Sequence, residues 1–341
     1  MGNSNSSSAL NKKSTAFDVI KHYSKLANVS PTELLVGKRV VVTGGNSGIG
    51  TETVKALAYA GATVLFGSRS IAAGEETLKT EILGTGPFLR SGEYTVPTAA
   101  SSRISIVQLD LEQLESIQTF AETVLKSGDR IDFLICNAGI MALPNREETP
   151  CKWEKQIGTN HFGHHYLISL LRQSMIDQST PSRIVLVSSI AHIQGNIDVN
   201  DLHFTKGRSY SAWTAYGQSK LANLLEAKEL ADQLSSTKVA AVSLHPGVIR
   251  TNLARHMDIL KNPLVNFIFD SLVVDKNIPQ GASTTLYACL EPSLDQLELR
   301  GSYLSDCAIA TPNTAGIDAE KKLRRALWDV TEKELNQALG K

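Results

Sequence analysis

Tyr216 and Lys220 stand four residues apart in Tyr-Gly-Gln-Ser-Lys, and Ser189 lies upstream of them. On a helix, side chains at this spacing share one face about 6 Å apart along the axis, so a phenol and an ammonium can point into one site. A nearby cation stabilises a phenolate and lowers its pKa from about 10. The three residues therefore predict proton transfer, whereas a Tyr-x-x-x-Lys pair alone also fits a solvated helix face.

A glycine-rich turn, Thr-Gly-Gly-Asn-Ser-Gly-Ile-Gly at residues 43–50, follows the apolar run 40–42. Glycines let a backbone approach a pyrophosphate, whose charge then lies at the positive end of the next helix. The spacing is G-x-x-x-G-x-G rather than G-x-G-x-x-G, and by itself the turn also fits an ordinary strand-to-helix loop. The predicted cofactor contacts in it are Gly44, Asn46, Ser47, Gly48, Ile49 and Gly50.

The second strand ends at Ser68 and Arg69, and no acidic residue occurs between residues 53 and 74. A site for NAD normally has an Asp or Glu about 20 residues after the turn, to accept from the ribose 2′-hydroxyl. The Arg69 guanidinium, with the Ser68 hydroxyl beside it, instead suits a 2′-phosphate. These residues predict NADP(H) over NAD(H).

Strands and helices alternate after residue 37, which favours a parallel sheet. We expect strands at 39–43, 63–67, 104–109, 131–136, 183–188, 238–244 and 301–304, and helices at 48–59, 72–82, 114–125, 152–175, 212–234, 282–289 and 319–338. The fold class is therefore α/β, a single doubly wound Rossmann-type domain over residues 37–338. Its sheet has seven, mainly parallel strands with helices on both faces.

Two further strand ends carry candidate cofactor contacts. Asp110 and Leu111 follow the third strand, and Asn137, Ala138 and Gly139 follow the fourth. Ligands of open parallel sheets lie beyond the carboxyl ends of the strands, so these residues are placed to contact the cofactor. An isolated Asp after a strand is also a common cap for the next helix.

The segments outside this alternation have simpler interpretations. Residues 1–15 are rich in Ser and Asn and predict a disordered arm, followed by a helical extension over 16–36. Residues 83–102 are loop-like and predict a surface insertion. The apolar segment 262–274 fits a packed helix or a substrate lid equally well.

Composition argues against nucleic acid as a partner, against disulfides and against a membrane-spanning segment. Lys plus Arg and Asp plus Glu both total 34 in the 341 residues, so charge does not favour nucleic acid. Cys136, Cys151, Cys289 and Cys307 form no C-x-x-C pair, which indicates reduced thiols and a cytoplasmic location. No apolar run reaches the roughly 18 residues of a membrane span, so any membrane contact is peripheral.

Peripheral contact has one candidate, because Met-Gly-Asn-Ser-Asn-Ser at the N-terminus matches the pattern for N-myristoylation of Gly2. Lys12 and Lys13 would add a small electrostatic attraction. The alternative is a start methionine followed by a flexible tail.

His161, His164 and His165 cluster, with the first and last at i,i+4 spacing. The run lacks the Glu of His-Glu-x-x-His, so packed or exposed histidines are favoured over zinc and no metal site is predicted. Tyr210 is a second tyrosine near Tyr216, but Thr214 lies four residues after it, so it has no lysine partner.

Taken in order, seven blocks make the chain resemble the short-chain dehydrogenase/reductase family, and more closely its retinol dehydrogenase and WW-domain oxidoreductase-like branch, over about residues 37–335. The blocks are Thr-Gly-Gly-Asn-Ser-Gly-Ile-Gly (43–50), Asn-Ala-Gly-Ile-Met (137–141), Gly-Thr-Asn-His-Phe-Gly-His (158–164), Val-Ser-Ser-Ile-Ala-His (187–192), Tyr-Gly-Gln-Ser-Lys-Leu-Ala-Asn (216–223), His-Pro-Gly-Val-Ile-Arg-Thr (245–251) and Leu-Trp-Asp-Val-Thr-Glu (327–332).

The resemblance implies roles for individual residues. Tyr216 would be the general acid or base, and Lys220 would lower its pKa and hold the nicotinamide ribose. Ser189 would bind the substrate oxygen, Asn160 would support a proton relay to Lys220, and Ser188 would be structural. The nicotinamide end of the cofactor would meet Pro246, Gly247, Val248 and Thr251.

Together these features predict reversible hydride transfer between NADP(H) and an alcohol or carbonyl. The apolar segment 262–274 predicts an apolar substrate, and the resemblance suggests a retinoid-like or other lipophilic aldehyde. The alternative is an NADPH-binding regulatory or scaffold protein with little turnover. Family analogy would let the helices at 152–175 and 212–234 pair two subunits. The interval from Ser189 to Tyr216 is slightly long for this branch, so the substrate rim is expected to differ.

Overall fold

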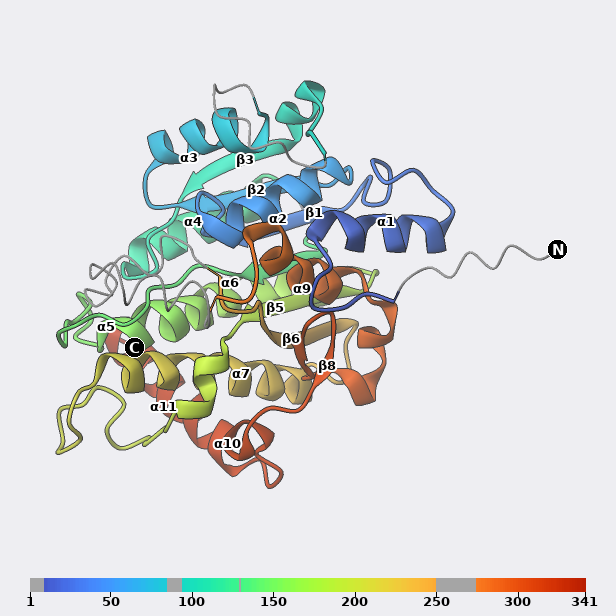
Figure 1. Cartoon of the computed structure of the whole chain (residues 1–341). Helices are drawn as coiled ribbons and strands as arrows, with labels where there is room; N and C mark the ends of the chain where they lie inside the picture. Colours follow the sequence, from blue (N-terminus) through green and yellow to red (C-terminus); the bar gives the residue numbers. More distant parts are fainter. Residues whose placement is uncertain (1–8, 85–93, 129, 250–273) are drawn as a thin grey trace, which may run out of the picture.

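Parallel strands form the centre of the molecule in the computed structural model, which describes residues 9–84, 94–128, 130–249 and 274–341 (Figure 1). The sheet order is β3-β2-β1-β4-β5-β6-β7-β8, and every neighbouring pair is parallel except β7 and β8. The strands are β1 Arg39–Thr43, β2 Thr63–Ser68, β3 Ile104–Gln108, β4 Phe133–Cys136, β5 Ser182–Val187, β6 Val239–His245, β7 Tyr303–Ser305 and β8 Ala308–Ala310. This order reverses between β1 and β4, which is where doubly wound folds bind ligands.

Over the described residues the sheet has eight strands, which corrects the predicted seven. The extra strand, β8, pairs antiparallel with β7 across a two-residue turn formed by Asp306 and Cys307. Both residues have left-handed backbones, with φ of 54° and 58°. Such turns usually contain Asn or Gly, so Asp-Cys gives no turn signal in the sequence.

Helices cover both faces of the sheet (Figure 1). They are α1 Ala16–Ala27, α2 Gly48–Tyr59, α3 Ile71–Thr77, α4 Leu114–Lys126, α5 Lys155–Ile157, α6 Gly163–Asp177, α7 Ala212–Gln233, α9 Ile278–Leu290, α10 Thr314–Ile317 and α11 Lys322–Ala338. One core joins α1, α2 and α9 to Val40, Val42 and Val64 of the sheet. The other joins α4, α6, α7 and α11 to the opposite side chains of the same strands, such as Val41 and Leu65, as alternation along a strand requires.

Two predicted helices are interrupted by π-helical turns. The expected helix 72–82 becomes α3 and a π segment, Leu78–Ile82. The expected helix 152–175 becomes α5, a π segment at Gly158–Phe162, and α6. Hydrophobic periodicity cannot reveal a single wide turn, because it shifts the helix face by only one residue.

The N-terminal region is more ordered, over its described residues, than expected. Lys12 forms an ion pair with Asp275, and Gln280 donates to the Lys13 carbonyl, so the predicted disorder does not extend to these residues. A capping box between Thr15 and Asp18 starts α1. The helix ends at Ala27 because Asn28 adopts a left-handed backbone, so it is shorter than the predicted extension over 16–36.

The predicted insertion at 83–102 packs in part on the N-terminal helices. Tyr94 stacks on Phe17 with ring centroids 4.9 Å apart, and its hydroxyl donates to Glu52. The interpretations of Gly2, of residues 85–93 and of the apolar segment up to residue 273 fall outside the described residues. Among the residues that the structure does describe, no helix is long and apolar enough to cross a bilayer.

Candidate active site

A cavity of about 810 Å³ lies at the carboxyl ends of the strands. Its volume falls in the range of small-molecule and cofactor sites. Most predicted site residues line it: Gly44, Asn46, Ser47, Gly48, Ile49, Ser68, Arg69, Asp110, Leu111, Asn137, Ala138, Gly139, Ser189, Tyr216, Lys220, Pro246, Gly247 and Val248. Two others, Gly50 and Asn160, support this lining from behind, and Thr251 falls outside the described residues.

The glycine turn is held by close packing. A Cβ atom at Gly50 would lie 2.1 Å from the Gly44 carbonyl oxygen and 2.6 Å from the Asn137 amide nitrogen, so no larger residue fits. Gly48 begins α2 and lines the cavity, while Ser47 precedes the helix without a side-chain cap bond. The positive end of α2 therefore faces the cavity, which suits a phosphate group.

Asn137 ties the end of β4 to this turn. Its side-chain amide donates to the Thr43 and Gly44 carbonyls at 2.9 and 3.3 Å. The Thr43 hydroxyl accepts in return from the backbone N–H groups of Asn137 and Ala138, both at 2.9 Å. The two strand ends that border the cavity are thus fixed to each other.

His164 extends this bonded chain to Asn160. The Thr43 hydroxyl lies 2.8 Å from His164 Nε2, and His164 Nδ1 lies 2.9 Å from the Asn160 carbonyl oxygen. Because a carbonyl only accepts, Nδ1 carries the proton and Nε2 accepts from Thr43. Burial lowers the pKa of His164 to about 4, which keeps the ring neutral. His164 was expected to be a packed or exposed histidine, and its link to Asn160 was not predicted, although the i,i+4 spacing of the two residues was visible.

Asn160 lies in the π segment and is fully buried. Its side chain accepts from the Ile140 N–H at 2.8 Å, and donates to the Ile140 carbonyl and to Ser219 Oγ, both at 2.9 Å. A Cβ at Gly139 would lie 3.0 Å from Asn160 Oδ1 and 3.4 Å from Lys220 Nζ, so both polar groups flank the same glycine. The expected proton relay through Asn160 stays a prediction.

Tyr216 and Lys220 lie on one face of α7 and are almost fully buried. Lys220 Nζ is 5.7 Å from the Tyr216 ring centroid and donates to the Val187 carbonyl at 3.0 Å. Burial lowers the pKa of Lys220 to about 8. Burial also raises the pKa of Tyr216 to about 12, partly opposed by a hydrogen bond with the Ser189 side chain. In the protein alone, burial therefore outweighs the expected lowering of the Tyr216 pKa by Lys220.

The two serines of the pair have different surroundings. Ser188 Oγ donates to the Lys220 carbonyl at 2.6 Å, so it supports α7. Ser189 lines the cavity, and its hydroxyl accepts from the Ala191 N–H at 3.2 Å while bonding Tyr216. The Ser189 hydroxyl and the Tyr216 phenol thus meet at one point of the cavity wall.

At the other end of the cavity, Arg69 is exposed and lines the wall, whereas Ser68 is buried. The Ser68 hydroxyl donates to the Ser70 carbonyl at 2.8 Å, so it is committed to the turn. Asp110 accepts from the Glu112 N–H at 3.0 Å, which makes it a turn cap as well as a lining residue.

Ile190, Ile193 and Trp213 form an apolar rim that the sequence analysis did not assign. They line the cavity beside Tyr216, and each remains about half exposed, at 45, 54 and 41%. The Trp213 ring meets the Tyr216 ring edge-on at 6.1 Å. Exposed apolar residues beside polar reactive groups are typical of a site for an apolar ligand.

The other two histidines of the 161–165 cluster lie against carboxylates. His161 Nδ1 and His165 Nδ1 each lie 3.0 Å from an oxygen of Glu226, and His165 Nε2 lies 3.2 Å from Glu332. His161 Nε2 also contacts the Thr331 hydroxyl at 3.0 Å. Within the described residues, no group of three or more His, Cys, Asp or Glu side chains suits a metal ion.

The sequence is similar to known oxidoreductases over most of its length. A family model described as short chain dehydrogenase matches residues 38–87 and 93–259. The chain is 37% identical over 307 residues to retinol dehydrogenase 14 of Homo sapiens, covering 88% of this chain and 86% of that protein. It is 38% identical over 297 residues to retinol dehydrogenase 12 of Homo sapiens, covering 87% and 86%.

A solved structure of an uncharacterized protein from Mycobacterium Paratuberculosis has a TM-score of 0.65 and 32% identity, covering 88% of this chain and 94% of that one. This similarity and the sequence matches extend well beyond the glycine turn, over most of each chain. The chain therefore belongs to the short-chain dehydrogenase/reductase family of oxidoreductases, which use nicotinamide cofactors.

Proposed function

We propose that this protein transfers a hydride between NADP(H) and an alcohol or carbonyl group on an apolar substrate. The observation that carries the proposal is the layout of one cavity. Ser189, Tyr216 and Lys220 lie at one end of it, and Arg69 lies with the glycine turn at the other.

The cavity fits a dinucleotide. The glycine turn lines the cavity beside the positive end of α2, where a pyrophosphate would lie. Arg69 is exposed at the wall and offers its guanidinium to a 2′-phosphate. Bound there, the cofactor would supply or accept the hydride.

The protein's own residues handle the proton. Ser189 Oγ, which bonds Tyr216, orients the substrate oxygen toward the phenol. In carbonyl reduction, the Tyr216 hydroxyl gives its proton to that oxygen as the hydride reaches the carbon, which yields the alcohol. In alcohol oxidation Tyr216 takes the proton back. Lys220 holds a positive charge 5.7 Å from the phenol ring, which favours the phenolate left after transfer.

An apolar substrate is favoured by the rim of Ile190, Ile193 and Trp213 beside Tyr216. The similar human proteins are named retinol dehydrogenases. A retinoid-like aldehyde or alcohol is therefore our proposed substrate class.

The test is oxidation of NADPH with a panel of apolar aldehydes that includes all-trans-retinal. Tyr216→Phe should lower kcat/KM at least about 100-fold, because it removes the proton donor. Tyr210→Phe is the matched control and should retain activity, since the Tyr210 hydroxyl bonds the Leu143 carbonyl and the Gln156 amide and Tyr210 does not line the cavity. No turnover by the parent across the panel would favour a regulatory or scaffold protein that binds NADPH.

The cofactor preference has its own test. Arg69→Ala should lower the ratio of kcat/KM for NADPH over NADH by about 10- to 100-fold, because a charge-assisted bond to the 2′-phosphate contributes about 1.5–3 kcal/mol. An unchanged ratio would contradict the assignment of Arg69.

A further inference from the structure

The backbone just after β6 is held by Asp275. Asp275 Oδ1 accepts from the Val248 N–H at 2.8 Å, and the Val248 carbonyl accepts from the N–H groups of Asp275 and Lys276 at 3.0 and 3.3 Å. Ile249 and Lys276 continue this pairing as a parallel bridge. The stretch 246–249 lines the cavity, so these bonds set the position of one cavity wall.

Lys276 supports the same wall from behind. Gly247 has φ of +103°, and a Cβ there would lie 2.5 Å from Lys276 Cδ, so the lysine stem packs directly on the glycine. The Lys276 side chain is fully buried, and its Nζ lies 2.6 Å from Asp306 Oδ1. A buried ammonium requires such a partner, because an unpaired charge away from water is costly.

Asp306 reaches Lys276 from a turn that is unfavourable for its residues. Both Asp306 and Cys307 are left-handed, which normally costs a non-glycine residue energy. The Cys307 N–H donates to Thr284 Oγ1 at 3.4 Å, and Cys307 Sγ lies 3.4 Å from Ser283 Oγ, so α9 holds the turn in place. The geometry of β7 and β8 thus presents a carboxylate to Lys276.

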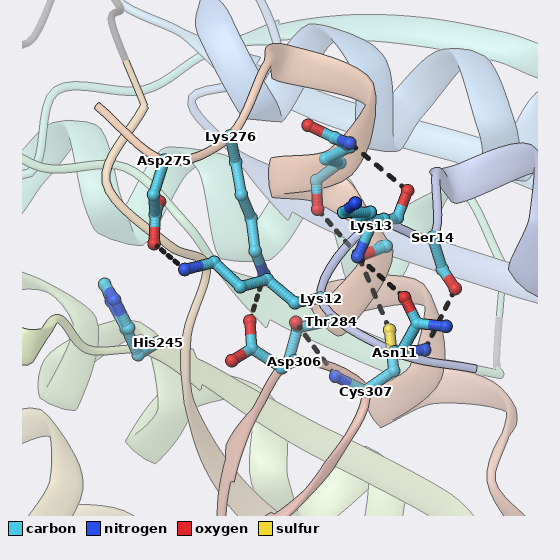
Figure 2. A network of polar contacts seen from close by, with 12 residues as sticks. Asn11, Lys12, Lys13, Ser14, His245, Asp275, Lys276, Thr284, Asp306 and Cys307 are labelled. Atoms are coloured by element: carbon cyan, nitrogen blue, oxygen red, sulfur yellow. Dashed lines mark hydrogen bonds and ion pairs between the residues drawn. The ribbon is translucent and has the colours of Figure 1, made fainter. Parts of the chain in front are cut away.

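Lys12 adds the N-terminal segment to this network. Its Nζ lies 2.9 Å from Asp275 Oδ2, the oxygen that does not bond Val248. Figure 2 shows Lys12 and Lys276 reaching the neighbouring carboxylates of Asp275 and Asp306, with His245 close by. Side chains from three separate parts of the sequence therefore alternate in charge behind residues 246–249. We call these four, Lys12, Asp275, Lys276 and Asp306, the charge clasp.

We propose that Lys12 and Lys276 are positioning residues which, through the charge clasp, hold the Gly247–Val248 backbone in place for the nicotinamide end of the cofactor. The N-terminal segment, placed before the catalytic fold in sequence, is then part of the cofactor site. The inference rests on the proposed function only in naming the nicotinamide end. The clasp itself acts on the protein's own backbone.

Hydrogen–deuterium exchange of the cofactor-free protein tests the clasp directly, in a peptide covering residues 244–249. Lys12→Ala should speed amide exchange there about two- to five-fold, as expected for loss of a partly exposed ion pair. Lys276→Met keeps the apolar stem on Gly247 and should have a larger effect. Lys13→Ala is the matched control, and Lys12→Arg should restore the parent rate.

The coupling between partners sharpens this test. Asp275→Asn keeps an oxygen that can accept from Val248 but removes the charge that faces Lys12. Lys12→Ala should therefore add nothing in an Asp275→Asn background. Equal exchange in the parent and Lys12→Ala, or equal changes for Lys12→Ala and Lys13→Ala, would overturn the proposal. If Lys276→Met loses its circular dichroism spectrum, the Lys12 and Asp275 variants decide alone.

Measuring cofactor affinity tests whether the charge clasp affects the nicotinamide end of the site. Lys12→Ala should weaken NADPH binding about two- to five-fold in fluorescence titration, while leaving adenosine 2′,5′-bisphosphate, which lacks the nicotinamide half, unaffected. Equal weakening of both ligands would indicate a global effect and contradict the proposal. If the parent binds no NADPH, the proposed function fails, yet the exchange measurement still decides whether the clasp holds the backbone.

Discussion

Helix α7 contributes to two buried polar regions: one favours the neutral forms of its titratable side chains and the other favours the charged forms. Near its start, Tyr216 and Lys220 face the cavity. Burial raises the pKa of Tyr216 and lowers that of Lys220, so it favours the neutral form of both side chains. Six residues after Lys220, Glu226 faces His161 and His165, and their attraction lowers the pKa of Glu226 to about 2 despite burial. The same contacts, with Glu332, raise the pKa of His165 to about 9 despite burial.

The two regions differ in whether a buried charge lies beside a side chain of opposite charge. The histidine region pairs each buried charge, so it can join α6, α7 and α11 in the charged state. In the active region Lys220 donates to a carbonyl oxygen, and no carboxylate among the described residues forms an ion pair with it. A charge without a counterion costs stability but leaves its field for a reacting group. Two separate stretches of α7 therefore serve different purposes: Tyr216 and Lys220 serve reactivity, and Glu226 serves stability.

The largest expected effect separates the two regions by activity. Lys220→Met should lower kcat about 100- to 10,000-fold, because the positive charge that stabilises the Tyr216 phenolate is lost. Its free energy of unfolding, measured by urea denaturation, should not fall, because a buried uncompensated ammonium is removed. A clear loss of stability would show that Lys220 is structural and would remove the contrast.

The matching change in the histidine region should do the reverse. Glu226→Gln should lower the free energy of unfolding by about 3–5 kcal/mol, since it removes the buried carboxylate charge that faces both His161 and His165 and leaves His165 with Glu332 alone. Activity per folded molecule should be retained. The control is Glu122→Gln, which breaks only an exposed pair with Lys126 and should change stability by less than about 0.5 kcal/mol. A Glu226→Gln variant as stable as this control would contradict the assignment.

The two regions should also give opposite pH dependence. The pKa of His165 is raised above 6.5, so its stabilisation is complete below pH 6.5 and is lost as pH rises to about 9, by up to about 3 kcal/mol. The pKa of Lys220 is lowered from 10.5 to about 8, so the unfolded chain binds more protons between these values and stability rises with pH there.

Urea denaturation from pH 6 to pH 10 measures both slopes. His165→Gln should flatten the fall between pH 6.5 and 8, and Lys220→Met should abolish the rise above pH 8. Parallel curves for the parent and both variants would mean that neither group is perturbed as described.

The features of the fold and site that could be predicted from the sequence are those set by local sequence patterns or by motifs. The strand β1 and the helix α2 were predicted with their observed bounds, because apolar runs and glycine punctuation are short-range signals. Strand ends then brought Ser189 to the same wall as Tyr216 and Lys220, since parallel strands share one carboxyl edge.

What could not be predicted depends on contacts between distant segments. Nothing near Lys12 in sequence indicates Asp275, and nothing near Glu226 indicates His165, because those pairings arise from the packing of whole elements. The different contacts of the clustered histidines were likewise not indicated by the sequence. His164 bonds both Thr43 and Asn160, whereas its neighbour His165 pairs with Glu226.

His164 and His165 provide the finest test of the comparison, because adjacent positions on α6 hold opposite protonation states. The pKa of His164 is lowered to about 4, so the ring is neutral in both the folded and unfolded chain above pH 7.5. His164→Phe should lower the free energy of unfolding by about 1–3 kcal/mol, because the buried Thr43 hydroxyl loses its acceptor. Above pH 7.5 this loss should not vary with pH, whereas the loss from His165→Gln should shrink as pH rises to 9. A His164 effect that also shrinks over that range would place a charge on His164, and the two regions would no longer be electrostatically distinct.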